Sequence, residues 1–537
     1  MRPVAALVAL LAIALATTAE PAPTTAGAGA QRPNVIIVLT DDQSVAELSR
    51  RTMPATLAAL KRHGNGTELT GSIVSSPLCC PSRAGLLSGQ YAHNNGVFDN
   101  EPGYPALTDK GSTLYSWLAA SGYRTGHLGR FLLNYHRPPP PGETYDTAGG
   151  LAAPPGVEHW FGYVGAPTAY YGATFSRNGT PVVLGSDRSG YTTRAINREA
   201  LGFVRGAKAD PRPFFLTVAQ LAPHSTNLTG PGPCGVGGLP LPEAGALGPW
   251  KSEPLPKAPS FDESQIADKP AWVESRPGIG AERRRDLTWG WRCALASLAS
   301  VDRGVGELVE QLDRQGELDR TAIFFTSDNG YFFGEHRIFL NKVYPYEEAL
   351  RVPLLARVPE RLLGKRVRRN GRPRRVGVPV NNLDLTATVL ELAGANPCDA
   401  DGVCRTLDGR SLLPLLRGER PSWSRGRALL AELGGIRECG VVPEGLGLNN
   451  YYDAIRTPRH LYVELDRVNR ETGQCDRPEY ELYDLREDPF QLRNRAINPA
   501  SRPPPATQAG LAARLETLRA CAGIAGRDPV RSRPFCE

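Results

Sequence analysis

The stretch from residue 76 to residue 89 places two adjacent cysteines in front of residues that favour a helix. We predict that Cys79 lies just before the helix N-terminus, with Pro81 at the first helical position, where its missing N–H costs nothing. The free N–H groups and the dipole of a helix favour an anion at such a place. Arg83 follows one turn later and can face the same point. The pattern therefore predicts a reactive position that holds negative charge.

Simpler roles for the two cysteines are half-cystines, buried thiols and metal ligands. Adjacent cysteines suit zinc poorly, since its cysteine ligands are usually separated by two or more residues, while a free cysteine is often simply buried. The sequence Cys79-x-Pro81-Ser82-Arg83, followed by Ala-Gly-Leu-Leu-Ser-Gly, nevertheless closely resembles the signature of the sulfatase family. In that family the first cysteine is oxidised to Cα-formylglycine (3-oxoalanine). The resemblance implies that Cys79, and not Cys80, is the modified residue.

Carboxylate and amide side chains follow two apolar runs of the chain. Asp41 and Asp42 come after one run, and Asp328 and Asn329 come after another. Oxygen ligands suit a hard divalent cation such as calcium or magnesium, although each pair alone is more often a helix cap or a turn. The resemblance to sulfatases implies that these four residues bind one calcium ion, which the modified Cys79 also contacts.

The resemblance covers the chain from about residue 33 to residue 494. Residues 222–224 resemble the active-site histidine segment of the family, residues 334–354 resemble the segment after the metal ligands, and residues 480–489 resemble the C-terminal signature. The two cysteines before Pro-Ser-Arg, with two asparagines shortly after, look most like the N-acetylglucosamine-6-sulfatase and bacterial arylsulfatase branch of this alkaline-phosphatase-like superfamily.

The resemblance also implies a reaction. A hydrated formylglycine at position 79 attacks sulfur, forms a covalent sulfate ester and expels sulfate as the aldehyde re-forms. A sulfate ester is an anion, so the cation, Arg83 and Lys342 would mask its charge. His224 or Lys342 would protonate the departing alcohol oxygen, because a general acid must lie within hydrogen-bond reach.

One segment, residues 126–134, departs from the family pattern. Arg130 stands where the family often has lysine. Because a guanidinium keeps its charge at ordinary pH, we expect Arg130 to bind sulfate through its planar fork and not to act as an acid or a base. His127 is then a candidate for the base of the second step, and we take His127 and His336 as candidates for substrate binding.

Composition and the N-terminal stretch indicate an exported protein. Residues 1–19 carry a basic start, an apolar run and small residues, which is typical of a secretory signal peptide. The run is too short for a membrane span, so we expect no stable membrane anchor and an extracellular or periplasmic location, or a lysosomal one in a eukaryote. Residues 20–32 are expected to form a linker, residues 33–420 a catalytic domain, and residues 421–537 a C-terminal subdomain.

Ten cysteines fit an oxidising compartment. Setting aside Cys79 and Cys80 leaves eight, enough for four disulfides. Sequence does not fix the pairing; close spacing favours the first two of the following pairs, and the other two are guesses. The pairs are Cys398–Cys404, Cys521–Cys536, Cys439–Cys475 and Cys234–Cys293, and glycosylation sequons occur at Asn65, Asn178 and Asn227.

Strands and helices alternate along most of the chain, which predicts an α/β fold with a large, mostly parallel mixed sheet sandwiched by helices. The C-terminal part instead shows short strands joined by turns, which predicts a smaller α+β region with an antiparallel sheet. In parallel sheets, ligands bind at the carboxyl ends of the strands, where the polar clusters should meet. The expected strands are 34–40, 123–126, 214–219, 321–326, 428–433, 452–456, 461–466 and 479–485; the expected helices are 54–62, 112–121, 194–205, 283–314, 383–393 and 511–521.

The net charge of +7, from 62 basic and 55 acidic residues, is a mild excess. No nucleic-acid motif accompanies it, so a basic rim that attracts a sulfated substrate is the better interpretation. The expected partners are a sulfated small molecule or glycan and, during maturation, a formylglycine-generating enzyme, with no nucleic acid. Two alternatives stay open: a phosphomonoester or phosphonate hydrolase of the same superfamily, and a sulfoglycan-binding protein without catalysis.

Overall fold

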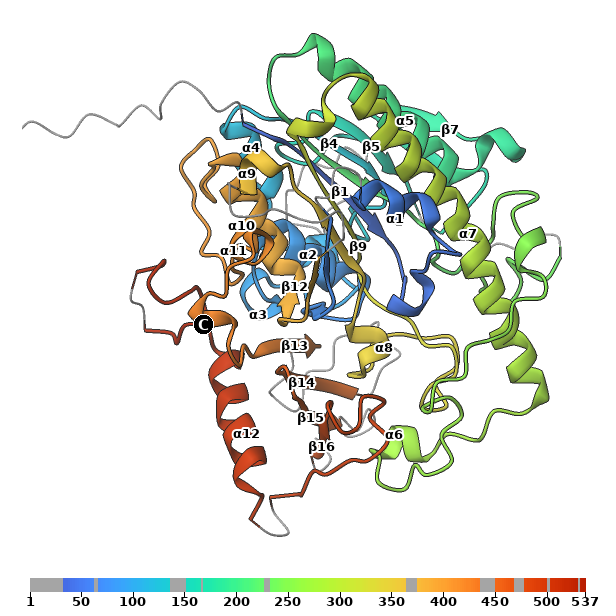
Figure 1. Ribbon diagram of the computed structural model, residues 1–537, viewed down its shortest axis with the longest axis vertical. Coiled ribbons are helices and arrows are strands. Elements are labelled where there is room, and N and C mark those ends of the chain that lie inside the picture. The colour runs from blue at the N-terminus through green and yellow to red at the C-terminus, as the bar shows by residue number, and fades with distance from the viewer. Residues whose placement is uncertain are drawn as a thin grey trace, which may run out of the picture.

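A ten-stranded mixed sheet forms the centre of the molecule in the computed structural model (Figure 1). Its strand order is β11-β2-β10-β9-β1-β8-β4-β5-β6-β7, and the five strands from β9 to β5 run parallel. The structure describes residues 32–61, 66–135, 151–165, 168–226, 232–363, 374–434, 450–467, 478–499, 503–529 and 532–537. The strands are β1 Asn34–Thr40, β2 Gly66–Leu69, β4 Arg124–Gly129, β5 His159–Tyr163, β6 Thr174–Arg177, β7 Thr180–Val183, β8 Phe214–Ala219, β9 Thr321–Ser327, β10 Leu354–Arg357 and β11 Arg374–Val376, beside a small pair of β3 Ser72–Ile73 with β12 Val380–Asn381.

Strand β1 shows why a continuous apolar run forms the middle of this sheet. All seven of its residues are buried. Val35, Ile37 and Leu39 pack into the core on one face, while Ile36 and Val38 pack into the core on the other. A strand covered on both faces needs apolar residues at every position, which is the pattern of parallel sheets.

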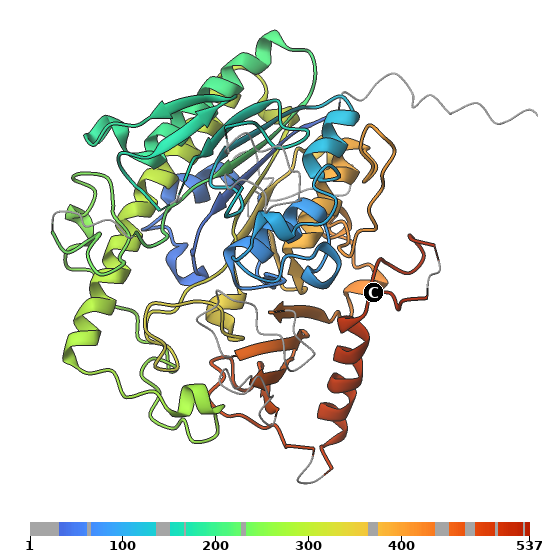
Figure 2. The same cartoon turned by 180° about the vertical axis from the view of Figure 1, so that it is seen from behind.

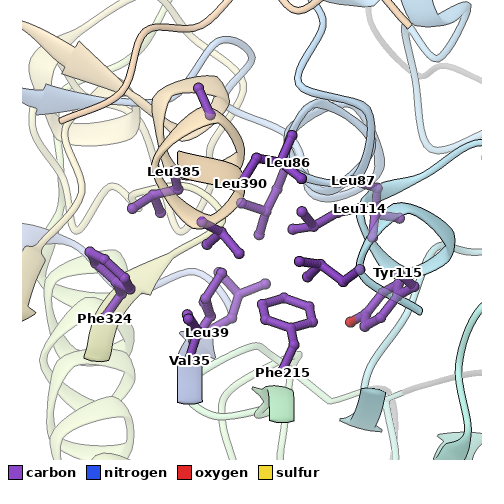
Figure 3. Close-up of a cluster of buried hydrophobic side chains, with 14 of the residues drawn as sticks. Val35, Leu39, Leu86, Leu87, Leu114, Tyr115, Phe215, Phe324, Leu385 and Leu390 are labelled. Carbon is purple, nitrogen blue, oxygen red and sulfur yellow. The ribbon is translucent and has the colours of Figure 1, made fainter. Parts of the chain in front are cut away.

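Helices cover both faces of the sheet (Figures 1 and 2). Helices α2, α4 and α10 contribute to the core on one face, part of which Figure 3 shows. Helices α1, α5 and the long α7 contribute to the core on the other face. The helices are α1 Pro54–Lys61, α2 Cys79–Ser88, α3 Ala92–Asn95, α4 Leu114–Ala120, α5 Thr192–Gly206, α6 Ala271–Glu274, α7 Ala281–Arg314, α8 Glu347–Leu350, α9 Glu360–Leu363, α10 Asn382–Ala393, α11 Leu413–Arg417 and α12 Ala506–Arg519.

The C-terminal part forms an antiparallel sheet in the order β13-β14-β15-β16, with α12 packed against it (Figure 1). Its strands are β13 Leu429–Leu433, β14 Asn450–Arg456, β15 His460–Arg467 and β16 Glu479–Asp484. Together with the central sheet, it confirms the predicted fold class. The predicted domain boundaries stay predictions.

The start of helix α2 differs from the prediction. The helix begins at Cys79, after Leu78, so Pro81 is its third residue and not its first. Proline is tolerated there because the N–H groups of the first turn have no partner within the helix. Cys79 thus lies inside the first turn, which still places its side chain at the N-terminal end.

Three predicted disulfides are present: Cys234–Cys293, Cys398–Cys404 and Cys521–Cys536. Cys439 and Cys475, the signal peptide and most of the linker, and the sequons at Asn65 and Asn227 lie outside the described residues, whereas Asn178 is exposed. In the described part of the chain, no helix is both long and apolar enough to cross a membrane.

A half-buried histidine links helix α3 to the C-terminal sheet. His93 Nδ1 lies 3.0 Å from Glu432 Oε2, and its Nε2 lies 3.0 Å from the carbonyl oxygen of Cys521. Burial alone would lower the pKa of His93, but Glu432 raises it to about 9. This pair predicts how the stability of the protein depends on pH.

We expect His93→Gln to destabilise the protein most below pH 6.5, by up to about 3 kcal/mol, where the histidine is charged in both the folded and the unfolded state. The difference should shrink as pH rises through about 9, because folded His93 then also loses its proton. Denaturant unfolding of both proteins at pH 6, 8 and 9.5 measures it. A difference that grows with pH would contradict this assignment.

Candidate active site

The predicted site residues meet where several parallel strands end. Asp41 and Asp42 follow β1, Asp328 and Asn329 follow β9, and the Cys79 end of α2 faces them. The same edge also receives the residues that follow β4 and β8, which are Arg130 and His224. This confirms the expectation that segments far apart in sequence converge at the carboxyl ends of the strands.

Gly129, the last residue of β4, lets the chain turn into this site. It has a φ of +104°, and a Cβ atom there would lie 1.8 Å from the carbonyl oxygen of Ala219. Only glycine fits so close to the neighbouring strand with this backbone conformation. The next residue, Arg130, donates its backbone N–H to the same carbonyl at 3.0 Å.

Arg83 bridges two buried carboxylates, and Arg130 contacts one of them. Arg83 Nη2 lies 2.9 Å from Asp41 Oδ2, Arg83 Nε lies 2.8 Å from Asp328 Oδ2, and Arg83 Nη1 lies 2.6 Å from the carbonyl oxygen of Arg130. Arg130 Nη1 lies 2.5 Å from Asp41 Oδ2. These side chains are at most 4 % exposed. Such burial of charge is stable only because each charge is paired.

Lys342 reaches the reactive position. Its Nζ lies 2.8 Å from Cys79 Sγ and 2.5 Å from Asp42 Oδ1. Burial raises the pKa of the Cys79 thiol to about 12, although Lys342 acts to lower it. Burial would lower the pKa of Lys342, but Asp42 and Cys79 raise it above its ordinary value. The unmodified site therefore holds a neutral thiol beside an ammonium group.

His224 lies on the opposite side of Asp42. Its Nε2 is 3.7 Å from Asp42 Oδ2, and its Nδ1 is 2.6 Å from the carbonyl oxygen of Ser225. A carbonyl only accepts hydrogen bonds, so Nδ1 carries the proton and Nε2 of the neutral ring faces the site. The hydroxyl of Tyr170 donates to the carbonyl oxygen of His224 at 2.7 Å and fixes this segment.

The donor set fits a divalent cation. One ligand atom from each of Asp41, Asp42, Cys79 and His224 lies within 4.8 Å of the others. Asn329 is fully buried, and its Oδ1 has no hydrogen-bond partner among the described residues. An unpaired buried oxygen beside carboxylates is the arrangement that a hard cation satisfies.

Asp42 also has a strained backbone, with a φ of +67°. This conformation is uncommon for a residue other than glycine and costs of order 1–3 kcal/mol, a cost that recurs at functional sites. Burial would raise the pKa of Asp42, but Lys342 and His224 hold it below its ordinary value. Asp42 is therefore fixed as a carboxylate at the centre of the group.

The two histidines predicted to bind substrate lie away from this point, which corrects the prediction. His336 is fully buried, its Nδ1 lies 2.8 Å from Glu263 Oε2, and its ring stacks on Tyr346. His127 is 3 % exposed and stacks on Trp160. Burial, and then Arg83, lower the pKa of His127 to about 3, so it lies beneath the site as a neutral ring.

Tyr170 and Tyr115 are residues of this region whose position sequence reasoning missed. Tyr170 is fully buried and donates its hydroxyl to the carbonyl oxygen of His224. Tyr115 contacts His127 from a helix that carried no chemical motif. No local signal in the sequence distinguishes either tyrosine from a core residue.

The family model described as Sulfatase matches residues 33–395. The chain belongs to the sulfatase family. The arylsulfatase of Volvox carteri is 31% identical over 527 residues, which cover 92% of this chain and 75% of that protein. The N-acetylglucosamine-6-sulfatase of Homo sapiens is 28% identical over 541 residues, covering 94% of this chain and 87% of that protein.

Solved sulfatase structures share the fold. One protein, whose structure contains its substrate D-glucosamine-2-N,6-O-disulfate, superposes with a TM-score of 0.69 at 22% sequence identity and covers 90% of this chain and 97% of that chain. Family membership and the predicted enzyme class agree: this sulfatase is a sulfuric ester hydrolase. The buried group around Cys79 is the place in the described structure where a metal could be bound.

Proposed function

We propose that the protein is a secreted, calcium-dependent sulfatase with Cys79 converted to formylglycine, acting on aryl sulfates or on the 6-sulfate of N-acetylglucosamine-type sugars. The observation that carries this proposal is the convergence of Lys342, Asp41 and Asp42 on Cys79 Sγ at the start of α2. The named relatives, an arylsulfatase and an N-acetylglucosamine-6-sulfatase, support the two substrate classes. Three disulfides and the signal-like N-terminal stretch support secretion.

Two groups that the unmodified polypeptide does not contain, a formylglycine at position 79 and a calcium ion, would complete the proposed site. A hydrated formylglycine supplies a hydroxyl nucleophile and a second hydroxyl from which product release can begin. Calcium, held by Asp41, Asp42, Asp328, Asn329 and residue 79, supplies charge that masks the sulfate. The unpaired Oδ1 supports Asn329 as a ligand, and the clustered ligand atoms support Asp41, Asp42 and residue 79.

Three side chains around residue 79 then have separate roles. The three guanidinium nitrogens of Arg83 donate hydrogen bonds to Asp41, Asp328 and the Arg130 carbonyl. Arg83 therefore fixes the two carboxylates and adds positive charge next to the site. Lys342 holds a proton within hydrogen-bond distance of position 79. His224 presents Nε2 to the site, where the ring, once it is also protonated on Nε2, can deliver that proton to the departing oxygen.

The proposal is tested by turnover of an aryl sulfate and the matching aryl phosphate, using protein produced with a formylglycine-generating enzyme. We expect the sulfate to be turned over faster, and a chelator to abolish activity that calcium restores. Preference for the phosphate would favour a phosphoester hydrolase. Binding of a sulfated glycan without turnover, with Cys79 unconverted, would favour the non-catalytic alternative.

Arg130 provides a sharper test of how sulfate is bound. Its side chain is 3 % exposed and already touches Asp41, so we propose a fixed charge and no proton transfer. Arg130→Lys should keep much of the activity, whereas Arg130→Ala should lose about 2–4 kcal/mol of transition-state stabilisation, as for removal of one oxyanion donor.

The measurement is kcat/KM for an aryl sulfate at several pH values. Arg212→Ala is the control, because this guanidinium is 45 % exposed and pairs with Glu158 on the surface. The Arg212→Ala substitution should change kcat/KM little. Wild-type activity in Arg130→Ala would show that the charge at this position is not used.

A further inference from the structure

His127 lies directly beneath Arg130 and has no path to the substrate. It is the fourth residue of β4, 3 % exposed, with its ring stacked on Trp160 at 5.4 Å and edge-on to Phe131 at 5.1 Å. These aromatic rings pack against the imidazole on two sides. Any effect of His127 on catalysis must therefore act through the groups that it contacts.

Both ring nitrogens of His127 are engaged. Nδ1 lies 2.7 Å from the hydroxyl of Tyr115, and Nε2 lies 3.2 Å from the carbonyl oxygen of Arg130. A carbonyl cannot donate a proton, so Nε2 must carry the hydrogen and Nδ1 must accept from Tyr115. The Tyr115 hydroxyl therefore sets the tautomer of His127, and His127 in turn donates to the Arg130 carbonyl.

The Arg130 carbonyl is thus held from two sides. Arg83 Nη1 donates to it at 2.6 Å, and His127 Nε2 donates at 3.2 Å. The backbone N–H of Arg130 is meanwhile bound to Ala219. The peptide groups on both sides of Arg130 are therefore fixed, which fixes the point from which its side chain reaches Asp41.

Packing alone does not hold this place rigidly. A small internal cavity borders Arg83, His127 and Arg130, and its walls are apolar side chains such as Leu86, Leu114, Phe131 and Phe215. Figure 3 shows Leu86, Leu114, Tyr115 and Phe215 in this region. Apart from Tyr115 and Thr217, which also line the cavity, these walls offer no hydrogen bond to a shifted arginine. If the His127 bond were lost, the Arg130 backbone would have space to move.

We propose that His127 and Tyr115 are positioning residues that fix Arg130 for the sulfate group, through the hydrogen bond from His127 Nε2 to the Arg130 carbonyl. The inference rests on the proposed function, because it assigns a purpose to Arg130 in sulfate binding. It gives His127 a role different from that of a base or a substrate ligand. Loss of a positioning residue of this kind typically lowers activity 10- to 100-fold.

Three variants separate the hydrogen bond from the bulk of the ring. His127→Phe removes the donor and keeps a flat ring, and we expect kcat for an aryl sulfate to fall about 10- to 100-fold with little change in KM. His127→Gln keeps an amide N–H near the place of Nε2 and should rescue most of the loss. Tyr115→Phe removes the hydroxyl that bonds His127 Nδ1 and should lower kcat by less than His127→Phe does. Rates are expressed per aldehyde-containing site, so that a lower yield of folded, converted protein does not appear as a lower kcat.

His93 supplies a matched control, because its Nε2 also bonds a backbone carbonyl, at 3.0 Å, outside the site. His93→Phe should lower thermal stability and leave kcat per site unchanged. A double variant tests the route: His127→Phe should have little further effect in an Arg130→Ala background, since coupled residues are not additive. The inference would be overturned if His127→Phe lowered kcat as much in the Arg130→Ala background as in the wild type, or if His127→Phe alone kept full activity.

The tautomer gives a readout that needs no turnover. In ¹⁵N NMR of histidine-labelled enzyme, assigned with His127→Gln, we expect His127 to carry its proton on Nε2. A proton on Nδ1 would overturn the inference and leave the proposed function intact. Conversely, an enzyme with the Nε2 tautomer and no sulfate turnover would contradict the proposed function and leave the geometry of this hydrogen bond standing.

Discussion

Arg83 makes the hydrogen bonds on which this site depends. Its guanidinium joins Asp41 after β1, Asp328 after β9 and the Arg130 carbonyl after β4. Two carboxylates this deeply buried would repel each other and lose their hydration unless a cation lay between them. The planar fork of arginine supplies that cation in a fixed geometry. Three strand ends are thereby tied to the first turns of α2, which carries Cys79.

The position of Cys79 explains why two adjacent cysteines differ. Cys79 points to Lys342 and Asp41, whereas Cys80 packs in the apolar core and its Sγ accepts the backbone N–H of Leu133 at 3.1 Å. Neighbouring residues of a helix point in directions about 100° apart. A step of one residue along the helix therefore places one thiol among charges and the other among hydrocarbon side chains.

Much of this arrangement was readable from the sequence, because it is encoded locally. The run at residues 35–39 is apolar at every position, which predicts a strand covered on both faces. The carboxyl end of this strand predicts where Asp41 and Asp42 lie. The environment of His336 was not readable. Its partner Glu263 lies 73 residues earlier, in a Pro-rich segment without periodicity, so no local pattern indicated that the histidine would be buried.

His127 was misplaced for a related reason. Strand alternation determines which face of the sheet a residue takes, but it does not reveal whether that face is the site or the core beneath it. The start of α2 shows the usual uncertainty at element ends, where a proline fits any position of the first turn. Predictions from local pattern thus held for the central parallel strands β1, β4, β8 and β9 and for the charges that follow β1 and β9. They missed the shorter strands nearer the edges of the sheet and failed where a distant segment determined burial.

The central claim is that residue 79 works as an aldehyde. Peptide mass spectrometry across residues 78–83 of active protein tests it most directly, with an aldehyde-specific label and turnover measured on the same sample. The account predicts formylglycine at position 79, an unmodified thiol at Cys80, and activity in proportion to the converted fraction. Full activity with an unconverted Cys79, or an aldehyde at position 80, would contradict it.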